Sequence, residues 1–245
     1  MCETKMMKLM ERSSFLYIHG DNDFKMREYY NTCGFKLGIG VNPFSRLGFG
    51  AAVWEAARGL CQYFEKEELI FSNKKVIELG AGTGIVSILV ALLGGDVTIT
   101  DKPELLNRIK RNVSFNIPSS FKPQVKVRAL RWGLDINQFP SDYDYILCSD
   151  ILYLHGSIPL ILETLLHLSN RNTIVYFAST MFYGQEVTRK GHVTLSQYFK
   201  TELVCRYDAE DVNVYRMLLN TANTAHLPNL YRRGWFHMRL DHSKD

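Results

Sequence analysis

A chain of 245 residues, 46% of them hydrophobic, is long enough to bury the core of one large domain. Its formal net charge of +4 comes without a long lysine or arginine block, so charge alone does not indicate a nucleic-acid partner. Five cysteines without a C-x-x-C pair argue against a disulfide framework or a zinc knuckle and favour a reducing cytosol or nucleus.

The sequence of the N-terminal part predicts a polar arm, then a β-hairpin and then an amphipathic helix. Residues 1–14 are polar, and the longest apolar run, "IVSILVALLGG", is too short to span a bilayer. "SFLYIHG" and "CGFKLGIGV" predict two short strands of a hairpin, separated by the polar segment "DNDFKMREYYNT". "GAAVWEAARGLCQYFEKEEL" has apolar residues at helical spacing and predicts an amphipathic helix. We expect a cytoplasmic protein without a membrane anchor.

From Lys74 onward, short apolar runs alternate with helical patterns. The runs "KKVIEL", "DVTIT", "VKVRAL", "YDYILCSD" and "NTIVYFAS" are too apolar to leave a wet face, which indicates a parallel sheet wrapped by helices. A helix around Val193 to Phe199 and two strands, "TELVCRY" and "VNVYRML", complete the pattern. We therefore expect one domain over residues 15–217 and a tail or peripheral extension over 218–245.

The segment "KKVIELGAGTG" is a predicted strand that runs into Gly80, Gly82 and Gly84. Glycines permit a sharp turn and a close approach of a ligand to the main chain. The spacing fails the G-x-G-x-x-G pattern of dinucleotide sites from either possible starting glycine. Glu78 at the strand end suits a cationic amino-acid moiety better than a pyrophosphate, which its carboxylate would repel.

Asp101 ends the next strand, where a carboxylate can accept hydrogen bonds from both ribose hydroxyls. A dinucleotide enzyme could use the same residue, so Asp101 alone does not decide between the cofactors. Glu78, the glycines and Asp101 together indicate S-adenosylmethionine. An ordinary tight turn is the structural alternative for the glycines.

Asp150 and Tyr153 follow a buried strand in "YDYILCSDILYLHGS" and are candidates for holding the methyl acceptor, because ligands of such sheets bind outside the carboxyl ends of the strands. Amino-methyltransferases of nucleic acids carry a proline pair where Ile151 and Leu152 stand, which disfavours a nucleobase acceptor. The alternatives are a helix N-cap for Asp150 and a rim aromatic for Tyr153. Scattered histidines give no metal set, and we expect no metal.

Five stretches resemble the seven-strand class I methyltransferases, and among them the methyltransferase-like 21 group of protein lysine methyltransferases. They are "SRLGFGAAVWEAARGLCQYFE", "KKVIELGAGTGIVSILVALLGGDVTITD", "VRALRWG", "SDILYL" and "EDVNVYR", and the resemblance runs from Cys33 to Met217. It is strongest to the branch that methylates a lysine of translation elongation factor 1-alpha. It implies a Rossmann-like, mostly parallel sheet with an antiparallel late strand, helices on both faces and an N-terminal hairpin.

Transferred position by position, the resemblance implies a set of site residues. Asp150 and Tyr153 would be catalytic, with Asp150 docking the lysine and Tyr153 serving as channel wall, hydrogen-bond partner or cation-π face. Desolvation and the adjacent sulfonium would deprotonate the lysine. Cofactor contacts would fall on Trp54, Gly80, Ala81, Gly82, Asp101, Trp132 and Ser149, and the pattern of the glycine loop itself adds Glu78 and Gly84.

The partner implied is elongation factor 1-alpha, bound by a monomer that makes no direct contact with nucleic acid. Four other functions stay open from the sequence: a lysine methyltransferase for another protein such as a chaperone, a methyltransferase for a small molecule or nucleic acid, a binding module without catalysis, and a nicotinamide oxidoreductase. The failed dinucleotide spacing disfavours the last of these.

Overall fold

The computed structural model describes residues 16–17, 26–42, 48–181 and 185–224, so the predicted arm 1–14 lies outside the described residues. A seven-stranded sheet runs through the domain in the order β6-β5-β4-β7-β8-β10-β9. Its strands are β4 (Lys75–Leu79), β5 (Asp96–Asp101), β6 (Val125–Ala129), β7 (Tyr145–Ser149), β8 (Ile174–Thr180), β9 (Phe199–Tyr207) and β10 (Val212–Leu219). β10 is antiparallel to both neighbours and the other pairs are parallel, which confirms the predicted sheet.

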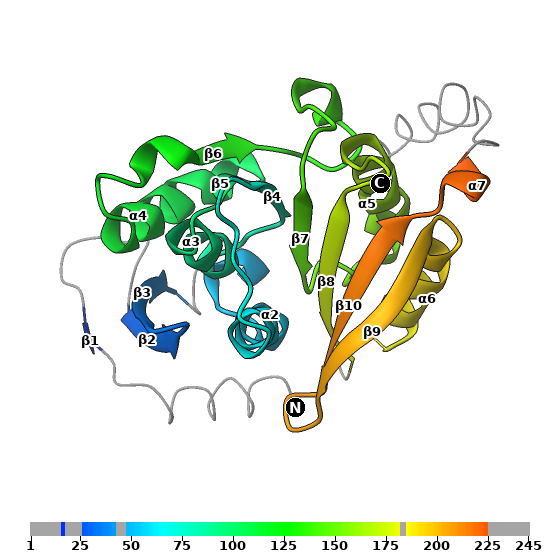
Figure 1. Ribbon diagram of the computed structural model, residues 1–245. Helices are drawn as coiled ribbons and strands as arrows, with labels where there is room; N and C mark the ends of the chain where they lie inside the picture. The colour runs from blue at the N-terminus through cyan, green and yellow to red at the C-terminus, as the bar shows by residue number, and fades with distance from the viewer. Residues whose placement is uncertain (1–15, 18–25, 43–47, 182–184, 225–245) are drawn as a thin grey trace, which may run out of the picture.

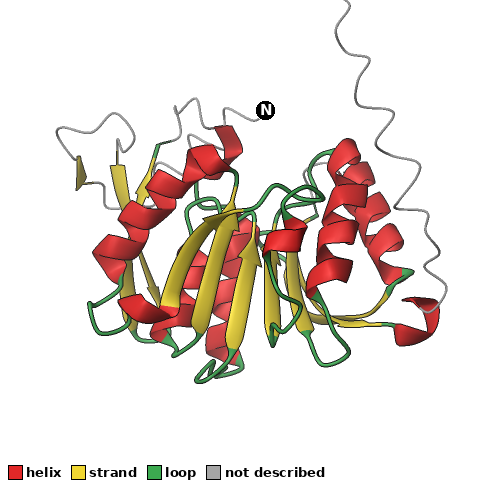
Figure 2. Cartoon of the chain, turned by 90° about the horizontal axis from the view of Figure 1, so that it is seen from above, coloured by secondary structure: helices red, strands yellow, loops and turns green. Residues whose placement is uncertain are grey.

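Helices cover both faces of this sheet (Figure 2). One face packs against α2 (Glu55–Lys66), α3 (Ile85–Leu92) and α4 (Leu106–Asn116), and the other against α5 (Ile158–Leu168) and α6 (Gln185–Ser196). Successive residues of a strand point to opposite faces. Val76 of β4 accordingly lies in the first core cluster, while Ile77 and Leu79 lie in the second. Both faces are apolar, as expected for a sheet covered on both sides.

The N-terminal hairpin differs from the prediction in its first strand. β2 (Met26–Thr32) pairs with β3 (Phe35–Val41) and lies within the segment predicted to be a polar connection. Of the predicted strand "SFLYIHG", β1 (Leu16–Tyr17) pairs with β2, and the remainder lies outside the described residues. The sequence of β2 lacks the apolar pattern of a buried strand, because only two of its residues, Met26 and Thr32, are buried.

The hairpin lies beside α4 at one end of the domain (Figure 1). Two amides one helical turn apart satisfy the open edge of β3: Asn112 Oδ1 accepts from Gly40 N at 2.8 Å, and Asn116 Oδ1 from Gly38 N at 2.7 Å. Asn112 Nδ2 also donates to Thr83 O at 2.9 Å. The buried Asn112 therefore ties the hairpin to the glycine loop.

The late helix was predicted with the wrong bounds. α6 begins at Gln185, and Phe199 starts β9 instead of ending a helix. Its buried positions are Thr188, Gly191 and Leu195, so only one of the three is a large apolar side chain that would reveal the helical period. Gly191 is required by close packing, because a Cβ there would lie 2.7 Å from Leu152 Cδ2. After β10 the chain forms α7 (Thr221–Thr224), and residues 225–245 are not described.

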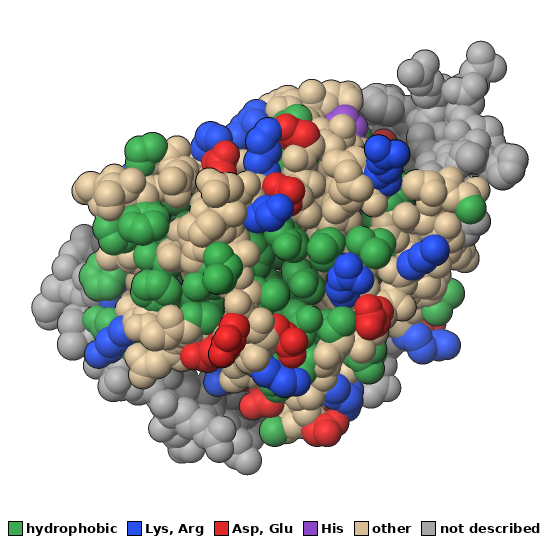
Figure 3. Space-filling view, viewed as in Figure 1, with side chains coloured by type: hydrophobic (Ala, Val, Ile, Leu, Met, Phe, Trp, Pro, Cys, Tyr) green, Lys and Arg blue, Asp and Glu red, His purple; other side chains and the backbone are tan. Residues whose placement is uncertain are grey.

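The surface of the described chain mixes both charge signs. On the face in Figure 3, apolar side chains gather in the middle, and lysines and arginines alternate with aspartates and glutamates around them. Within the described residues, no helix has the length and apolar character needed to cross a bilayer.

Candidate active site

The parallel strands place the predicted site residues at one edge of the sheet. β4 is flanked by β5 on one side and β7 on the other. The strands that follow β4 in sequence are thus added first to one side of it and then to the other, so the strand order reverses at β4. Ligands of open α/β sheets bind at such a switch point, outside the carboxyl ends of the strands. The glycine loop follows β4, Asp101 ends β5, Trp132 follows β6, Ser149 ends β7 and Asp150 comes directly after it.

The glycine loop between β4 and α3 has the backbone that its sequence predicts. Gly80, Gly82 and Gly84 have φ angles of 66°, 57° and 80°, a left-handed region that favours glycine. Gly84 is the N-cap of α3. A Cβ on Gly80 would lie 2.9 Å from both Ile151 Cγ2 and Trp132 Cζ2. Gly80 is thus required by its backbone conformation and by the indole that covers it.

We expect Gly80→Ala to destabilise the protein more than Gly82→Ala does. Both changes force alanine into the left-handed region, which costs about 1 kcal/mol. Only Gly80→Ala also displaces Trp132, for a total of about 3 kcal/mol, since the nearest atom to a Cβ on Gly82 is Gly50 O at 3.6 Å. Urea denaturation of the two variants measures the difference, and equal losses would contradict the close approach of Trp132.

Asp101 fixes the middle of this loop. Its Oδ2 accepts a hydrogen bond from Gly82 N at 2.7 Å, and its Oδ1 accepts one from Lys102 N at 2.7 Å. Burial raises the pKa of the carboxyl, and these two hydrogen bonds oppose that shift. A carboxylate oxygen has two lone pairs, so each oxygen retains one with which to accept a ligand hydroxyl.

Glu78 was predicted to contact the cofactor, and the structure shows a buried carboxyl group directed to α3. Its side chain is 1% exposed, and Oε2 accepts a hydrogen bond from Ser87 N at 3.1 Å. Burial raises the pKa of Glu78 to about 8. The described contact supports a positioning role, in which Glu78 holds the first turn of α3 behind the glycine loop; direct contact with a cofactor stays a prediction.

The raised pKa of Glu78 makes stability depend on pH. The folded protein holds the proton up to about pH 8, whereas an unfolded glutamate releases it near pH 4.5. The free-energy cost of keeping Glu78 protonated in the folded protein is therefore absent below about pH 4.5 and grows as the pH rises to about 8. We expect the unfolding free energy of Glu78→Gln to gain on the order of 5 kcal/mol relative to that of the wild type over this range. Parallel curves of unfolding free energy against pH would contradict it.

Asp150 connects three elements. It has a φ of 50°, uncommon for a residue other than glycine. Its Oδ1 accepts from Thr180 N at 2.7 Å and its Oδ2 from Thr180 Oγ1 at 2.8 Å, while the backbone N–H of Ala56 at the start of α2 donates to the same carboxyl. Burial raises the pKa of Asp150, and these bonds oppose the shift. Sequence reasoning missed Thr180, whose only local signal is its position at the end of a predicted strand.

Ile151 and Leu152 are buried in the second core cluster, which brings Tyr153 back to the surface with 41% exposure. Burial raises the pKa of the Tyr153 hydroxyl, and the charge of Asp101 raises it further. The phenol is therefore neutral at physiological pH and close enough to Asp101 to sense its charge. The structure thus brings the predicted acceptor and cofactor residues to one edge of the sheet, where Ile151 lies against Gly80 and Tyr153 senses Asp101.

The remaining predicted residues lie in the glycine loop, at the end of β7, after β6 and at the N-cap of α2. Trp132 is partly buried against Gly80, and Trp54 is 37% exposed at the N-cap of α2. Ser149 is partly buried at the end of β7, and Ala81 is buried, donating its N–H to Thr100 O at 3.0 Å. Neither residue has an ionisable side chain. Ala81 could contact a cofactor through its methyl group or main chain, and Ser149 also through its hydroxyl.

A short helix over the glycine loop was not predicted. The 3₁₀ helix η1 (Gly48–Ala51) brings Gly50 O to 3.6 Å from a Cβ built on Gly82. Arg108 of α4 is buried and its Nη1 donates to Ala51 O at 3.4 Å. The small residues of "GFGAA" were the available signal for this close approach.

Comparison with known proteins agrees with this architecture. The fold is that of a class I methyltransferase: the N-methyltransferase NodS from Bradyrhizobium japonicum WM9, solved with S-adenosyl-L-homocysteine, superposes with a TM-score of 0.50 at 17% identity over 73% of this chain and 89% of NodS. The family model described as "Lysine methyltransferase" matches residues 40–194. The chain belongs to this lysine methyltransferase family, which confirms the predicted class of enzyme.

Curated relatives carry the similarity beyond the family model. EEF1A lysine methyltransferase 3 of Xenopus tropicalis is 48% identical over 77% of this chain and 84% of its own length. The mouse protein of the same name is also 48% identical, over 75% of this chain and 78% of its own. Protein N-lysine methyltransferase METTL21A of Danio rerio is 41% identical over 74% and 83%.

Proposed function

We propose that the protein transfers a methyl group from S-adenosylmethionine to a lysine of translation elongation factor 1-alpha in the cytoplasm. The observation that carries the proposal is that Asp101, the glycine loop and Asp150–Tyr153 meet at one edge of the sheet in a lysine methyltransferase fold. The substrate is inferred from the names of the two relatives that are 48% identical.

The residues at this edge of the sheet suit the cofactor. Asp101 retains acceptor capacity for the two ribose hydroxyls, and Gly82 has no side chain between the loop backbone and η1. Trp132 and Trp54 offer indole faces at the same edge of the sheet. When bound, S-adenosylmethionine supplies a methyl group on a sulfonium. Asp101, the loop of Gly80, Ala81, Gly82 and Gly84, Trp54, Trp132 and Ser149 are the residues proposed to hold it.

The acceptor lysine must lose its proton, because its pKa is about 10.4 in water and the ammonium has no lone pair. Asp150 is poorly suited to act as the base, since a carboxylate beside an ammonium stabilises the charged form. Its carboxyl is already held by Thr180 and Ala56, which fixes its direction. Asp150 therefore aims the lysine, while the ring of Tyr153, which is 41% exposed before substrate binds, limits the contact of the lysine with water and so lowers the lysine pKa.

A labelled-methyl assay tests the substrate. Wild-type protein is incubated with labelled S-adenosylmethionine and purified elongation factor 1-alpha, beside a whole-cell lysate. Label on the factor supports the proposal. Label on another lysate protein alone would retain the lysine methyltransferase and reject this substrate.

A further inference from the structure

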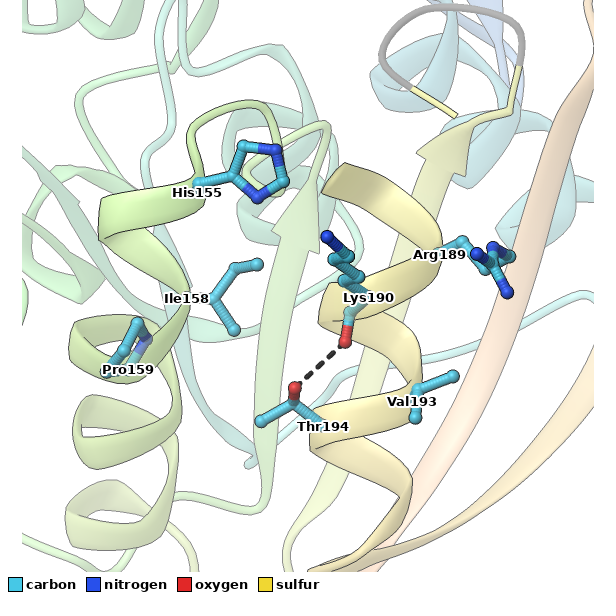
Figure 4. A pocket seen from close by; sticks show the side chains of 7 residues that line it. All are labelled: His155, Ile158, Pro159, Arg189, Lys190, Val193 and Thr194. Atoms are coloured by element: carbon cyan, nitrogen blue, oxygen red, sulfur yellow. Dashed lines mark hydrogen bonds between the residues drawn. The ribbon is translucent and has the colours of Figure 1, made fainter. Parts of the chain in front are cut away.

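A hollow of about 420 Å³ lies between the N-terminal end of α5 and the middle of α6 (Figure 4), and its lining begins two residues after Tyr153. It is lined by His155, Ile158, Pro159, Arg189, Lys190, Val193 and Thr194. We propose that this hollow docks an acidic segment of the protein substrate, with an apolar side chain beside the acid, adjacent to the target lysine. The inference rests on the proposed function, because it states how that substrate is held.

The hollow is continuous with the acceptor site. Tyr153, Leu154 and His155 are consecutive, and the short helix η5 (His155–Ser157) leads from them into α5. Tyr153 is 41% and Leu154 is 53% exposed, so exposed apolar side chains connect the acceptor residues to the hollow. A chain whose lysine enters beside Tyr153 therefore passes His155 within its next few residues.

The lining provides apolar surface with a surplus of positive charge. Ile158 and Lys190 project toward one another between the two helices, with His155 above them (Figure 4). The carboxylate of Glu186 interacts with the basic side chains Lys190, His155 and Arg189. Lys190 Nζ lies 2.6 Å from Glu186 Oε1. The hydrogen bond and charge of Lys190 lower the pKa of Glu186, and His155 and Arg189 lower it further.

One acid facing two permanent cations and a histidine leaves net positive charge, which selects an acidic partner. Val193 is 54% exposed on α6, one turn from Arg189, and with Ile158 and Pro159 it gives an apolar side chain a place to bury. A substrate carboxylate beside an apolar residue matches both the positive charge and the apolar lining of the hollow. A nucleic-acid phosphate would match the charge but would bury no apolar group against Ile158, Pro159 and Val193.

Charge reversal at Arg189 tests this docking. Arg189 is exposed on α6, so Arg189→Glu changes the charge of the hollow without disturbing a core residue. We expect the KM for elongation factor 1-alpha to rise about tenfold, with kcat within about twofold and cofactor affinity unchanged. Val193→Asp, which removes apolar contact at the same hollow, is expected to raise KM in the same direction.

Arg171→Glu is the matched control, because Arg171 is also an exposed arginine but lies just before β8, at the amino ends of the parallel strands and so away from the hollow. A raised KM for Arg189→Glu and Val193→Asp with an unchanged control supports the docking surface. Equal KM values for all variants, with active wild type, overturn it and leave the proposed function standing. An inactive wild type that binds cofactor overturns both.

Discussion

Replacing Asp101 by alanine is expected to weaken S-adenosylmethionine binding about a hundredfold. The carboxylate accepts Gly82 N–H and Lys102 N–H on separate oxygens and retains one lone pair on each for a ribose hydroxyl. Alanine removes both ligand contacts and leaves the Gly82 N–H without its acceptor, so the loop also loses its fixed position. Isothermal titration calorimetry of the purified variant measures the affinity directly.

Two variants separate the ribose contact from a general effect of charge. Asp142→Ala removes an exposed aspartate that pairs with Lys75 at the start of β4, and we expect it to bind cofactor as wild type does. Asp101→Asn keeps one acceptor oxygen and should lie between wild type and alanine. Cofactor affinity of Asp101→Ala within threefold of wild type would reject the assignment of Asp101 to the ribose.

Replacing Asp150 by alanine is expected to lower kcat at least about a hundredfold while cofactor affinity stays within about threefold. The reason is that Asp150 directs the lysine, whereas the ribose and glycine-loop contacts do not involve it. The same change leaves the N–H groups of Thr180 and Ala56 without their acceptor, so we expect a loss of about 2 kcal/mol in unfolding free energy. Steady-state kinetics below the melting transition separates the two effects.

Thr180→Val distinguishes aiming from stabilisation. It removes the hydrogen bond from Thr180 Oγ1 to Asp150 and keeps the one from Thr180 N–H. We expect a stability loss of about 1 kcal/mol and a fall in kcat of less than about tenfold. If Asp150→Ala turns over at the wild-type rate, or loses cofactor as completely as Asp101→Ala, the aiming role is wrong.

The parts of the fold and site that could be predicted are those with local signals. Gly80, Gly82 and Gly84 were predicted to be required by the turn, and each has a positive φ. Asp101 was placed correctly because parallel strands bring their carboxyl ends to one edge. Asp150 and Tyr153 follow another strand of the same sheet and reach the same edge for the same reason.

Contacts between distant segments could not be predicted. Thr180 lies 30 residues after Asp150, and no local pattern indicates that its hydroxyl and N–H bind that carboxylate. The side chain of Glu78 could point to a ligand or to α3, and only tertiary packing decides between them. β2 was missed because most of its side chains are partly exposed, so it lacks the apolar run that indicated the other strands.

The most direct test of the proposed function is mass spectrometry of elongation factor 1-alpha after incubation with wild-type protein and S-adenosylmethionine carrying a deuterated methyl group. We expect the deuterated methyl on a lysine side chain of the factor, and none when Asp150→Ala replaces the wild type. A factor left unmodified by wild-type protein that binds the cofactor tightly would contradict the proposed function.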